Sequence, residues 1–230
     1  MSIKLENIWF RYPRSERWAL EGISITFKEG EISVIIGPNG SGKTTLLKIA
    51  SLLYKPSKGS VKLWGRDFWT LDKAERISFR RRLVYIHEKP ILLKGTALYN
   101  IAYPLLLRGF PRDDALDLGR RLLERFGISS LADKPASTLS AGEAQLTSIL
   151  RAVAINPRFL FLDEPLAHLD LEKRSLVTSV MKELAKSGAG IVIATHDYSL
   201  AYSISDRVVL LEEGRIAAEG GVAEIFKRKA

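Results

Sequence analysis

Two segments near the start of the chain alternate apolar and polar residues. Their apolar positions are Ile3, Leu5 and Ile8 in the first segment, and Ile23, Ile25 and Phe27 in the second. Successive side chains of a β-strand point to opposite faces, so a period of two marks a strand with one buried face. The pattern therefore predicts a small antiparallel β subdomain.

Farther along, apolar residues form short unbroken runs, which lie within residues 32–36, 158–162, 191–194 and 208–211. Strands that are buried on both faces have this composition and are usually parallel. Helical spacing occurs between the runs, for example at Val177, Val180, Met181 and Leu184. Strands that alternate with helices predict an α/β core.

The middle of the chain, from about residue 91 to residue 155, has helix signals and no convincing strand. The apolar positions with helical spacing there include Leu146, Ile149, Leu150 and Val153. We therefore expect a single domain, 1–230, in which residues 91–155 form a helical subdomain. Residues 1–90 and 156–230 are expected to form the α/β core together with its β subdomain.

Composition excludes several classes of protein. Of 230 residues, 46% are hydrophobic and 27% are charged, which is typical of a soluble globular chain. No apolar run reaches the length of about 20 residues that a membrane span needs, and no signal peptide is evident. Cysteine is absent, so disulfides and thiolate metal sites are excluded. The net charge of +9 is compatible with nucleic acid or an anionic surface, but we favour an ordinary solvated basic surface.

Residues 37–44 read GPNGSGKT, which fits the phosphate-binding loop G-x-x-x-x-G-K-[ST]. An apolar run precedes this loop and a helical pattern follows it, as the motif requires. The glycines allow backbone N–H groups to approach phosphate oxygens at the positive end of the next helix. Lys43 is expected to reach the β- and γ-phosphates, and Thr44 to bind Mg²⁺ through its hydroxyl group.

Residues 159–164 read FLFLDE, a buried strand that ends in two carboxylates. In a P-loop protein, Asp163 would hold the water shell of Mg²⁺. Glu164 would then polarise the water that attacks the γ-phosphate. A solvated turn is the alternative reading of such a pair, and the phosphate loop in the same chain argues against it.

Residues 139–143 read LSAGE, which on its own is a helix capping box with Ser140 at the N-cap and Glu143 three residues later. The start of this helix would carry positive potential that suits a phosphate. The residues alone do not say whose phosphate this would be.

Five segments follow one another along the chain: GPNGSGKT, LSAGE, FLFLDEP, LAHLD and ATHD. Together they resemble the ATP-binding cassette of ABC transporters, and the resemblance extends along essentially the whole chain. LSAGE is similar to the family signature LSGGQ, which separates this family from other P-loop ATPases. The resemblance implies an α/β P-loop ATPase core with an N-terminal antiparallel β subdomain and an inserted helical subdomain. It also implies a head-to-tail dimer in which each ATP lies between one phosphate loop and the partner's signature helix.

Further site residues are carried over from the family. Tyr12 resembles the aromatic residue that stacks on adenine, an ordinary exposed aromatic being the alternative. Asp170 resembles the aspartate at the dimer contact, and His196 resembles the switch histidine that touches the γ-phosphate. The residues expected to bind nucleotide are Tyr12, Gly37, Pro38, Asn39, Gly40, Ser41, Gly42, Lys43, Thr44, Thr45, Glu88, Ser140, Gly142, Asp163 and Asp170. The expected metal-binding residues are Thr44, Asp163 and Glu88, and the expected catalytic residues are Glu164, His196 and Lys43.

The chain departs from the family pattern at several positions. Glu88, or alternatively His87, stands where the family usually has the glutamine that enters the helical subdomain. Glu88 can accept a bond from a metal-bound water, but an ionised carboxylate cannot donate one. In the signature, Ala141 and Glu143 replace glycine and glutamine, and Glu143 would repel ATP if it pointed inward.

The resemblance implies an ATP-hydrolysing subunit of an ABC membrane transporter that uses ATP and Mg²⁺ on the cytoplasmic side of the membrane. The expected partners are a permease subunit, a second cassette and a substrate-binding protein, with no nucleic acid. The segment from Glu88 to Gly109 and the run LSAGEAQ resemble importers of tungstate-like oxyanions, with other importers close behind. The alternatives are a soluble ABC ATPase that acts on DNA or ribosomes, an ABC subunit for another substrate class, and a binding module without catalysis.

Overall fold

The computed structural model describes residues 1–167 and 169–227, so His168 of the LAHLD segment and residues 228–230 lie outside the described residues. The chain forms two compact units. The first contains residues 1–85, 158–164 and the described part of 182–230, and the second contains residues 86–157 and 165–181. Each unit is described by itself.

A mainly parallel sheet holds the described strands of the α/β core in the order β10-β9-β3-β8-β7-β6. Its strands are β3 (Ile32–Ile36), β6 (Leu83–Ile86), β7 (Phe159–Asp163), β8 (Gly190–Thr195), β9 (Arg207–Glu212) and β10 (Arg215–Gly220). Strand β3 pairs in parallel with β8 and β9, and β7 pairs in parallel with β8. Every residue of β3, β7 and β8 is buried, which confirms the interpretation of the apolar runs as buried parallel strands.

A second sheet, in the order β2-β1-β4-β5, contains β1 (Ser2–Phe10), β2 (Leu20–Lys28), β4 (Lys58–Leu63) and β5 (Arg66–Asp67). Strand β1 pairs antiparallel with both β2 and β4, which confirms the predicted antiparallel subdomain. A short 3₁₀ helix, η1 (Phe68–Thr70), and helix α2 (Lys73–Arg80) follow this sheet.

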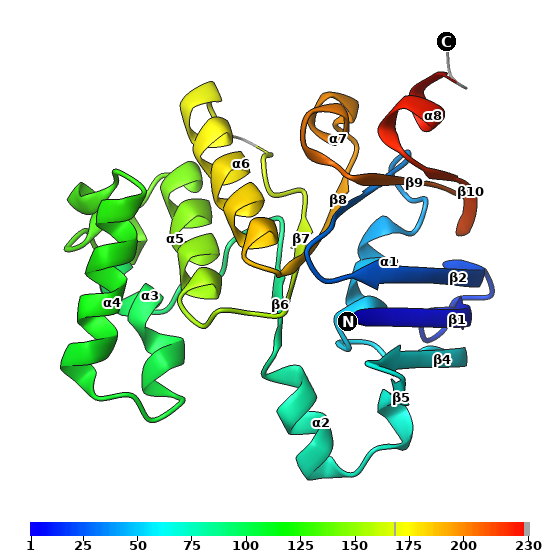
Figure 1. The fold of residues 1–230 in the computed structure, drawn as a ribbon, viewed down its shortest axis with the longest axis horizontal. Helices are drawn as coiled ribbons and strands as arrows, with labels where there is room; N and C mark the ends of the chain where they lie inside the picture. The colour runs from blue at the N-terminus through cyan, green and yellow to red at the C-terminus, as the bar shows by residue number, and fades with distance from the viewer. Residues whose placement is uncertain (168, 228–230) are drawn as a thin grey trace. The chain divides into compact units, whose positions relative to one another are not determined.

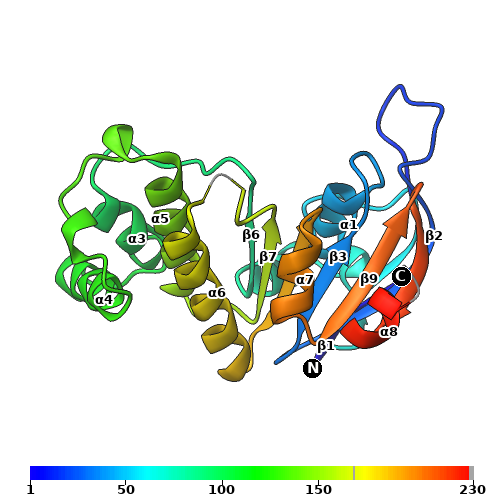
Figure 2. The same ribbon diagram turned by 90° about the horizontal axis from the view of Figure 1, so that it is seen from above.

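One hydrophobic core joins the two sheets of the first unit. Leu46 and Leu47 of α1 (Lys43–Ala50) pack in the same cluster as Phe27 of β2 and Phe161 of β7. Helix α1 continues from the loop after β3, as Figure 2 shows. The two ends of this loop are therefore anchored, one by the buried strand β3 and the other by the largely buried helix α1. The other described helices of this unit are the last turn of α6 (Leu171–Lys186), α7 (Tyr198–Ile204) and α8 (Val222–Lys227).

The second unit is built from helices. Its described helices are α3 (Ala97–Leu106), α4 (Arg112–Arg125), η2 (Ser129–Leu131), η3 (Ala136–Thr138), α5 (Ala141–Val153) and the first part of α6. Helices α3, α4 and α5 lie side by side in Figure 1 and share a core that includes Ile101, Leu123 and Leu150. Between residues 91 and 155 the β-type pairing that the structure records is an isolated bridge between Thr96 and Pro135.

Residues 165–181, which the sequence groups with the α/β core, belong to the second unit. The physical reason is close packing on the signature helix. A Cβ atom added to Gly142 of α5 would lie 2.7 Å from Cδ of Lys173 and 3.1 Å from Cδ2 of Leu169. Periodicity alone shows that α6 is amphipathic, but it does not show which neighbour its first turns contact.

In the described part of the chain, no helix is both long enough and apolar enough to cross a membrane.

Candidate nucleotide site

The phosphate loop runs from the end of β3 to the start of α1, where Gly42 is the N-cap residue. Gly42 has φ 102° and no side-chain hydrogen bond caps the helix. A Cβ atom at this position would lie 2.6 Å from the backbone oxygen of Ala19, so both the conformation and the close approach require glycine. Because no side chain occupies the helix start, its backbone N–H groups can bind an anion.

Lys43 lies inside the loop with only 7% of its surface exposed. Its Nζ atom donates to the backbone oxygens of Gly37 at 2.8 Å and Pro38 at 3.0 Å. Burial lowers the pKa of the Lys43 amino group, while the carboxylates of Glu164 and Asp163 act in the opposite direction. The ammonium group is therefore held where phosphate oxygens would replace the two carbonyl acceptors.

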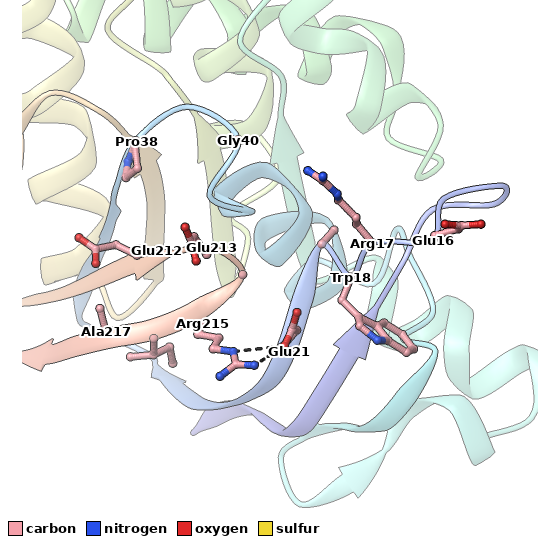
Figure 3. A pocket seen from close by; sticks show the side chains of 13 residues that line it. Glu16, Arg17, Trp18, Glu21, Pro38, Gly40, Glu212, Glu213, Arg215 and Ala217 are labelled. Carbon is pink, nitrogen blue, oxygen red and sulfur yellow. Dashed lines mark hydrogen bonds and ion pairs between the residues drawn. The ribbon is translucent and has the colours of Figure 1, made fainter.

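The other loop residues divide between the two faces of the loop. Ser41 is buried, and its Oγ atom has no hydrogen-bond partner among the described residues. Pro38 and Gly40 line an open pocket of about 1280 Å³, and Asn39 is exposed beside them. Arg17 extends from its own loop into the same pocket, while Arg215 binds Glu21 on the opposite wall (Figure 3). One face of the loop is thus packed on the protein and the other is accessible to a ligand.

Asp163 lies at the end of β7, and its carboxylate accepts hydrogen bonds from two hydroxyl groups. Oγ1 of Thr44 donates to one carboxylate oxygen at 3.0 Å, and the hydroxyl group of Tyr85 donates to the other at 2.9 Å. Burial and the neighbouring Asp163 raise the pKa of Tyr85, so its proton stays on the phenol oxygen. Hard oxygen ligands of this kind suit Mg²⁺. The sequence predicted Thr44 and Asp163 but not Tyr85, because a tyrosine at the end of an apolar strand carries no motif.

Glu164 follows Asp163 and is held by β8. Oγ1 of Thr195 donates to one carboxylate oxygen of Glu164 at 2.8 Å, and the backbone N–H of His196 donates to the other at 3.0 Å. Nδ1 of His196 lies 2.8 Å from the latter oxygen. The Glu164 backbone has φ 45°, a conformation that costs a non-glycine residue about 1 kcal/mol. Three groups of β8 and its end thus orient one carboxylate, and Thr195 is a contributor that sequence reasoning missed.

Tyr12 is part of an aromatic cluster next to α1. Its ring meets Phe10 edge-on at 5.2 Å and Tyr54 edge-on at 6.1 Å, and its hydroxyl group lies 2.8 Å from Oγ1 of Thr45. Lys48 lies over the ring of Tyr54. The Tyr12 side chain is therefore fixed by its neighbours although the residue is 40% exposed. A fixed exposed ring is suited to stacking on a base.

The remaining predicted residues lie in the second unit. Ser140 accepts the N–H of Glu143 at 3.3 Å, and Glu143 accepts the N–H of Ser140 at 2.7 Å, which completes the predicted capping box. Gly142 is buried under Leu169 and Lys173. Asp170 binds Lys173 and caps the first turn of α6 through the Lys173 N–H at 2.9 Å. Glu88 is exposed after β6. The roles of these residues toward a nucleotide stay predictions.

The buried strand, the glycine loop, its buried lysine and the Thr44–Asp163 contact define the class of P-loop nucleoside triphosphatases. Comparison with known proteins narrows the class, because residues 20–167 match the ABC transporter family. The chain belongs to this family and is an ABC-type ATPase. The predicted family, fold class and ATPase activity are thereby confirmed.

Individual relatives support the assignment. The chain is 35% identical over 216 residues to the phosphate import ATP-binding protein PstB 2 of Natronomonas pharaonis, covering 90% of this chain and 76% of that protein. It is 36% identical over 230 residues to the methionine import ATP-binding protein MetN of Caulobacter vibrioides, covering 99% and 69%. A solved dimeric ATP-binding cassette in a post-hydrolysis state, bound to ADP and phosphate, has a TM-score of 0.87 at 29% identity, covering 96% of this chain and 98% of that chain.

Proposed function

We propose that the chain is the ATP-hydrolysing subunit of an ABC importer and that it works on the cytoplasmic side of a membrane. The observation that carries the proposed ATP hydrolysis is the pair Asp163–Glu164, whose two carboxylates are bound by different partners. Asp163 is bound by Thr44, and Glu164 is bound by Thr195 and His196. Two neighbouring acids in different environments can take different roles in one reaction.

The phosphate loop and its flanking residues would bind ATP. Tyr12 would stack on the adenine ring, and the free N–H groups before α1 would bind the phosphates. Lys43 would exchange its two carbonyl acceptors for oxygens of the β- and γ-phosphates. The buried, unpartnered hydroxyl group of Ser41 fits the same reading, since a bound ligand would supply its missing acceptor.

Thr44 and Asp163 would hold Mg²⁺, with Glu88 as the third predicted contributor. The bound ion would neutralise negative charge that develops on the transferred phosphoryl group. Among the described residues, no three His, Asp or Glu side chains form a metal site by themselves. The chain would therefore bind the ion together with the nucleotide. Tyr85 would keep Asp163 in place through its hydrogen bond of 2.9 Å.

Glu164 would accept a proton from the attacking water. Its carboxylate is oriented by Thr195 and by the backbone of His196, so its oxygens have a defined direction before water arrives. The His196 ring is largely exposed and lies at the edge of this contact, where it could bind the γ-phosphate. Hydrolysis would release phosphate and leave ADP in the loop.

A second copy of the chain is the proposed partner for nucleotide binding. Ser140 and Gly142 would face the phosphate loop of that copy, and Asp170 would lie at the contact between copies.

A permease subunit is the second proposed partner. A pocket of about 580 Å³ inside the second unit has a lining that includes Pro90, Leu92, Leu93, Pro135 and Ala144, and it could take a short permease helix. The exposed side chains of Ile91, Leu107 and Phe110 belong to the same 88–110 segment.

For the substrate we propose an oxyanion, with a substrate-binding protein delivering it to the permease. The tungstate-like resemblance of the sequence and the phosphate importer among the relatives support this class. The methionine importer among the relatives is the competing alternative. An ABC ATPase that acts on DNA or ribosomes has no specific observation in its favour.

The experiment that tests the proposal uses Glu164→Gln. The variant should bind Mg-ATP normally, lose ATP hydrolysis about 100-fold or more, and sediment as a dimer with Mg-ATP, because the base is lost while the binding groups remain. Glu212→Gln is the matched control, since this carboxylate lines the pocket beside the loop without binding the predicted catalytic groups. Near-normal turnover of Glu164→Gln would show that Glu164 is not the base.

A further inference from the structure

Two segments, residues 95–97 and 134–136, contribute Gly95, Thr96, Pro135 and Ala136 to the wall of the 580 Å³ pocket and bind each other through their backbones. The N–H of Ala136 donates to the oxygen of Gly95 at 2.8 Å, and the N–H of Ala97 donates to the oxygen of Lys134 at 3.0 Å. Thr96 and Pro135 form the bridge between these bonds. We therefore expect residues 95–97 and 134–136 to move together, because separating them would break two backbone hydrogen bonds.

A buried amide holds the first of these segments to α3. Asn100 is fully buried, and its carboxamide accepts the N–H of Leu93 at 2.8 Å. The same carboxamide donates to the backbone oxygens of Leu93 and Thr96, each at 3.0 Å. The wall of the pocket is thus a defined structure rather than a loose loop.

The side chain of Lys134 leaves this wall and reaches the start of the signature helix. Its Nζ atom lies 2.9 Å and 3.0 Å from the two carboxylate oxygens of Glu143. The same carboxylate accepts the backbone N–H of Ser140, the N-cap of α5. One side chain therefore connects the pocket wall to the cap of the helix that is expected to meet a phosphate.

The charges explain why this connection matters in this chain. Glu143 stands where the family signature has a neutral glutamine, so a carboxylate lies beside a phosphate-binding helix end. Lys134 neutralises that carboxylate and, with the Ser140 backbone, lowers the pKa of Glu143. Lys173, also near this helix end, forms an ion pair with Asp170, and its pKa is raised by Asp170 and to a smaller extent by Glu143.

We infer that Lys134 is a positioning residue that couples the pocket wall at residues 95–97 to the phosphate-binding end of α5 through its ion pair with Glu143. The inference rests on the proposed function, in which Ser140 meets the nucleotide of a second copy. ATP bound at Ser140 pulls on the capping box, and the Lys134 side chain passes that change to residues 134–136 and 95–97. A partner that occupies the pocket acts on the capping box by the same route, since coupling between two sites is reciprocal.

Hydrogen exchange tests the coupling in the Glu164→Gln background, with Mg-ATP as the probe. Three sets of amides are followed: the phosphate loop at 39–44, the cap at 140–143 and the pocket wall at 95–97. Mg-ATP should slow exchange in all three sets, and Lys134→Met should abolish the change at 95–97 while leaving that at 39–44. Lys134→Arg keeps the charge and should restore it. Arg120→Met is the control, because it removes an exposed ion pair with Asp117 elsewhere in the second unit.

Kinetics give a second readout that a merely structural lysine would not produce. Lys134→Met removes the ion-pair partner of the Glu143 carboxylate, so the KM for ATP should rise about fivefold while kcat changes little. Adding Glu143→Gln to Lys134→Met removes the unpaired charge and should return the KM to within about twofold of the wild type.

The outcomes separate the coupling from the proposed function. Slowed exchange at 95–97 that persists in Lys134→Met, or an equal loss in Arg120→Met, would overturn the coupling while ATP binding stands. A double variant that is no better than Lys134→Met would overturn the charge argument. If Mg-ATP leaves residues 39–44 unprotected, the proposed function fails, and the coupling fails with it.

Discussion

Two helix N-termini in this molecule are expected to meet phosphate, and they are built in opposite ways. Helix α1 begins after Gly42, which has a left-handed conformation and offers no side chain to the helix start. Helix α5 begins after Ser140, whose hydroxyl group and reciprocal partner Glu143 form a capping box. The first end leaves its N–H groups to a ligand, whereas the second already satisfies part of its own hydrogen bonding.

The difference indicates two distinct tasks. The end of α1 has a buried lysine beside it, and all the groups expected to bind an anion there come from one chain. The end of α5 has a carboxylate beside it, compensated by Lys134, and is stable without any ligand. A ligand at α5 would therefore meet a helix end whose hydrogen bonding is already partly satisfied, which we expect to suit a contact that forms and breaks.

The largest effect is expected from adding one methyl group to the α1 end with Gly42→Ala. The new Cβ would lie 2.6 Å from the Ala19 oxygen, and alanine at φ 102° is strained. The loop must shift, and a misplacement of about 1 Å can cost about 100-fold in rate. Steady-state ATPase should fall by about that factor, and ATP binding measured by calorimetry should weaken with it. Unchanged binding would mean that the loop tolerates a side chain here.

The equivalent change at the start of α5 is Gly142→Ala, and its effect can be compared directly with that of Gly42→Ala at the start of α1. Gly142 has ordinary helical geometry, and the added Cβ would mainly meet Lys173 at 2.7 Å from its Cδ atom. The flexible lysine can move, so we expect about a tenfold loss of ATPase, in line with modest overpacking. Binding of ATP to the isolated chain should stay normal, because the α1 end is untouched. A loss equal to that of Gly42→Ala would contradict the distinction between the two ends.

The smallest effect is expected from Ser140→Ala, which removes the hydroxyl group of the cap. The Ser140–Glu143 bond is long at 3.3 Å and exposed, so the loss of stability should be about 0.5 kcal/mol. The chain should melt about 1 to 2 °C lower in circular dichroism. Ser140→Thr keeps the hydroxyl group and serves as the control. A larger loss of stability would show that α5 depends on this cap more than its geometry suggests.

Sequence patterns predicted the sheet and the phosphate loop because their signals are local. Buried strands such as Ile32–Ile36 read as continuous apolar runs, and the glycine pattern specifies the turn and the helix that follows. The capping box at Ser140 was predicted for the same reason, since both partners lie within four residues.

Other parts depend on contacts between distant residues that no spacing rule records. Tyr85 reaches Asp163 across 78 positions, and Thr195 reaches Glu164 across 31. Nothing in the sequence marks the ion pair of Lys134 with Glu143, although Glu143 itself stands out as an acid in place of the family glutamine. These partners emerge only when the fold brings strand ends and loops together.

The three strands whose ends carry the chemistry are buried at every position, and this has a consequence for local unfolding. Amides of β3, β7 and β8 should exchange with solvent mainly when the first unit opens as a whole, because these strands are buried along their full length. Helix α2 has no buried residue, so its amides should exchange through local fraying. The phosphate loop, Asp163 and Thr195 are thus attached to the slowest-exchanging segments of the unit. We therefore expect the distances between the phosphate loop, Asp163 and Thr195 to persist through the small fluctuations that repeatedly open helix α2.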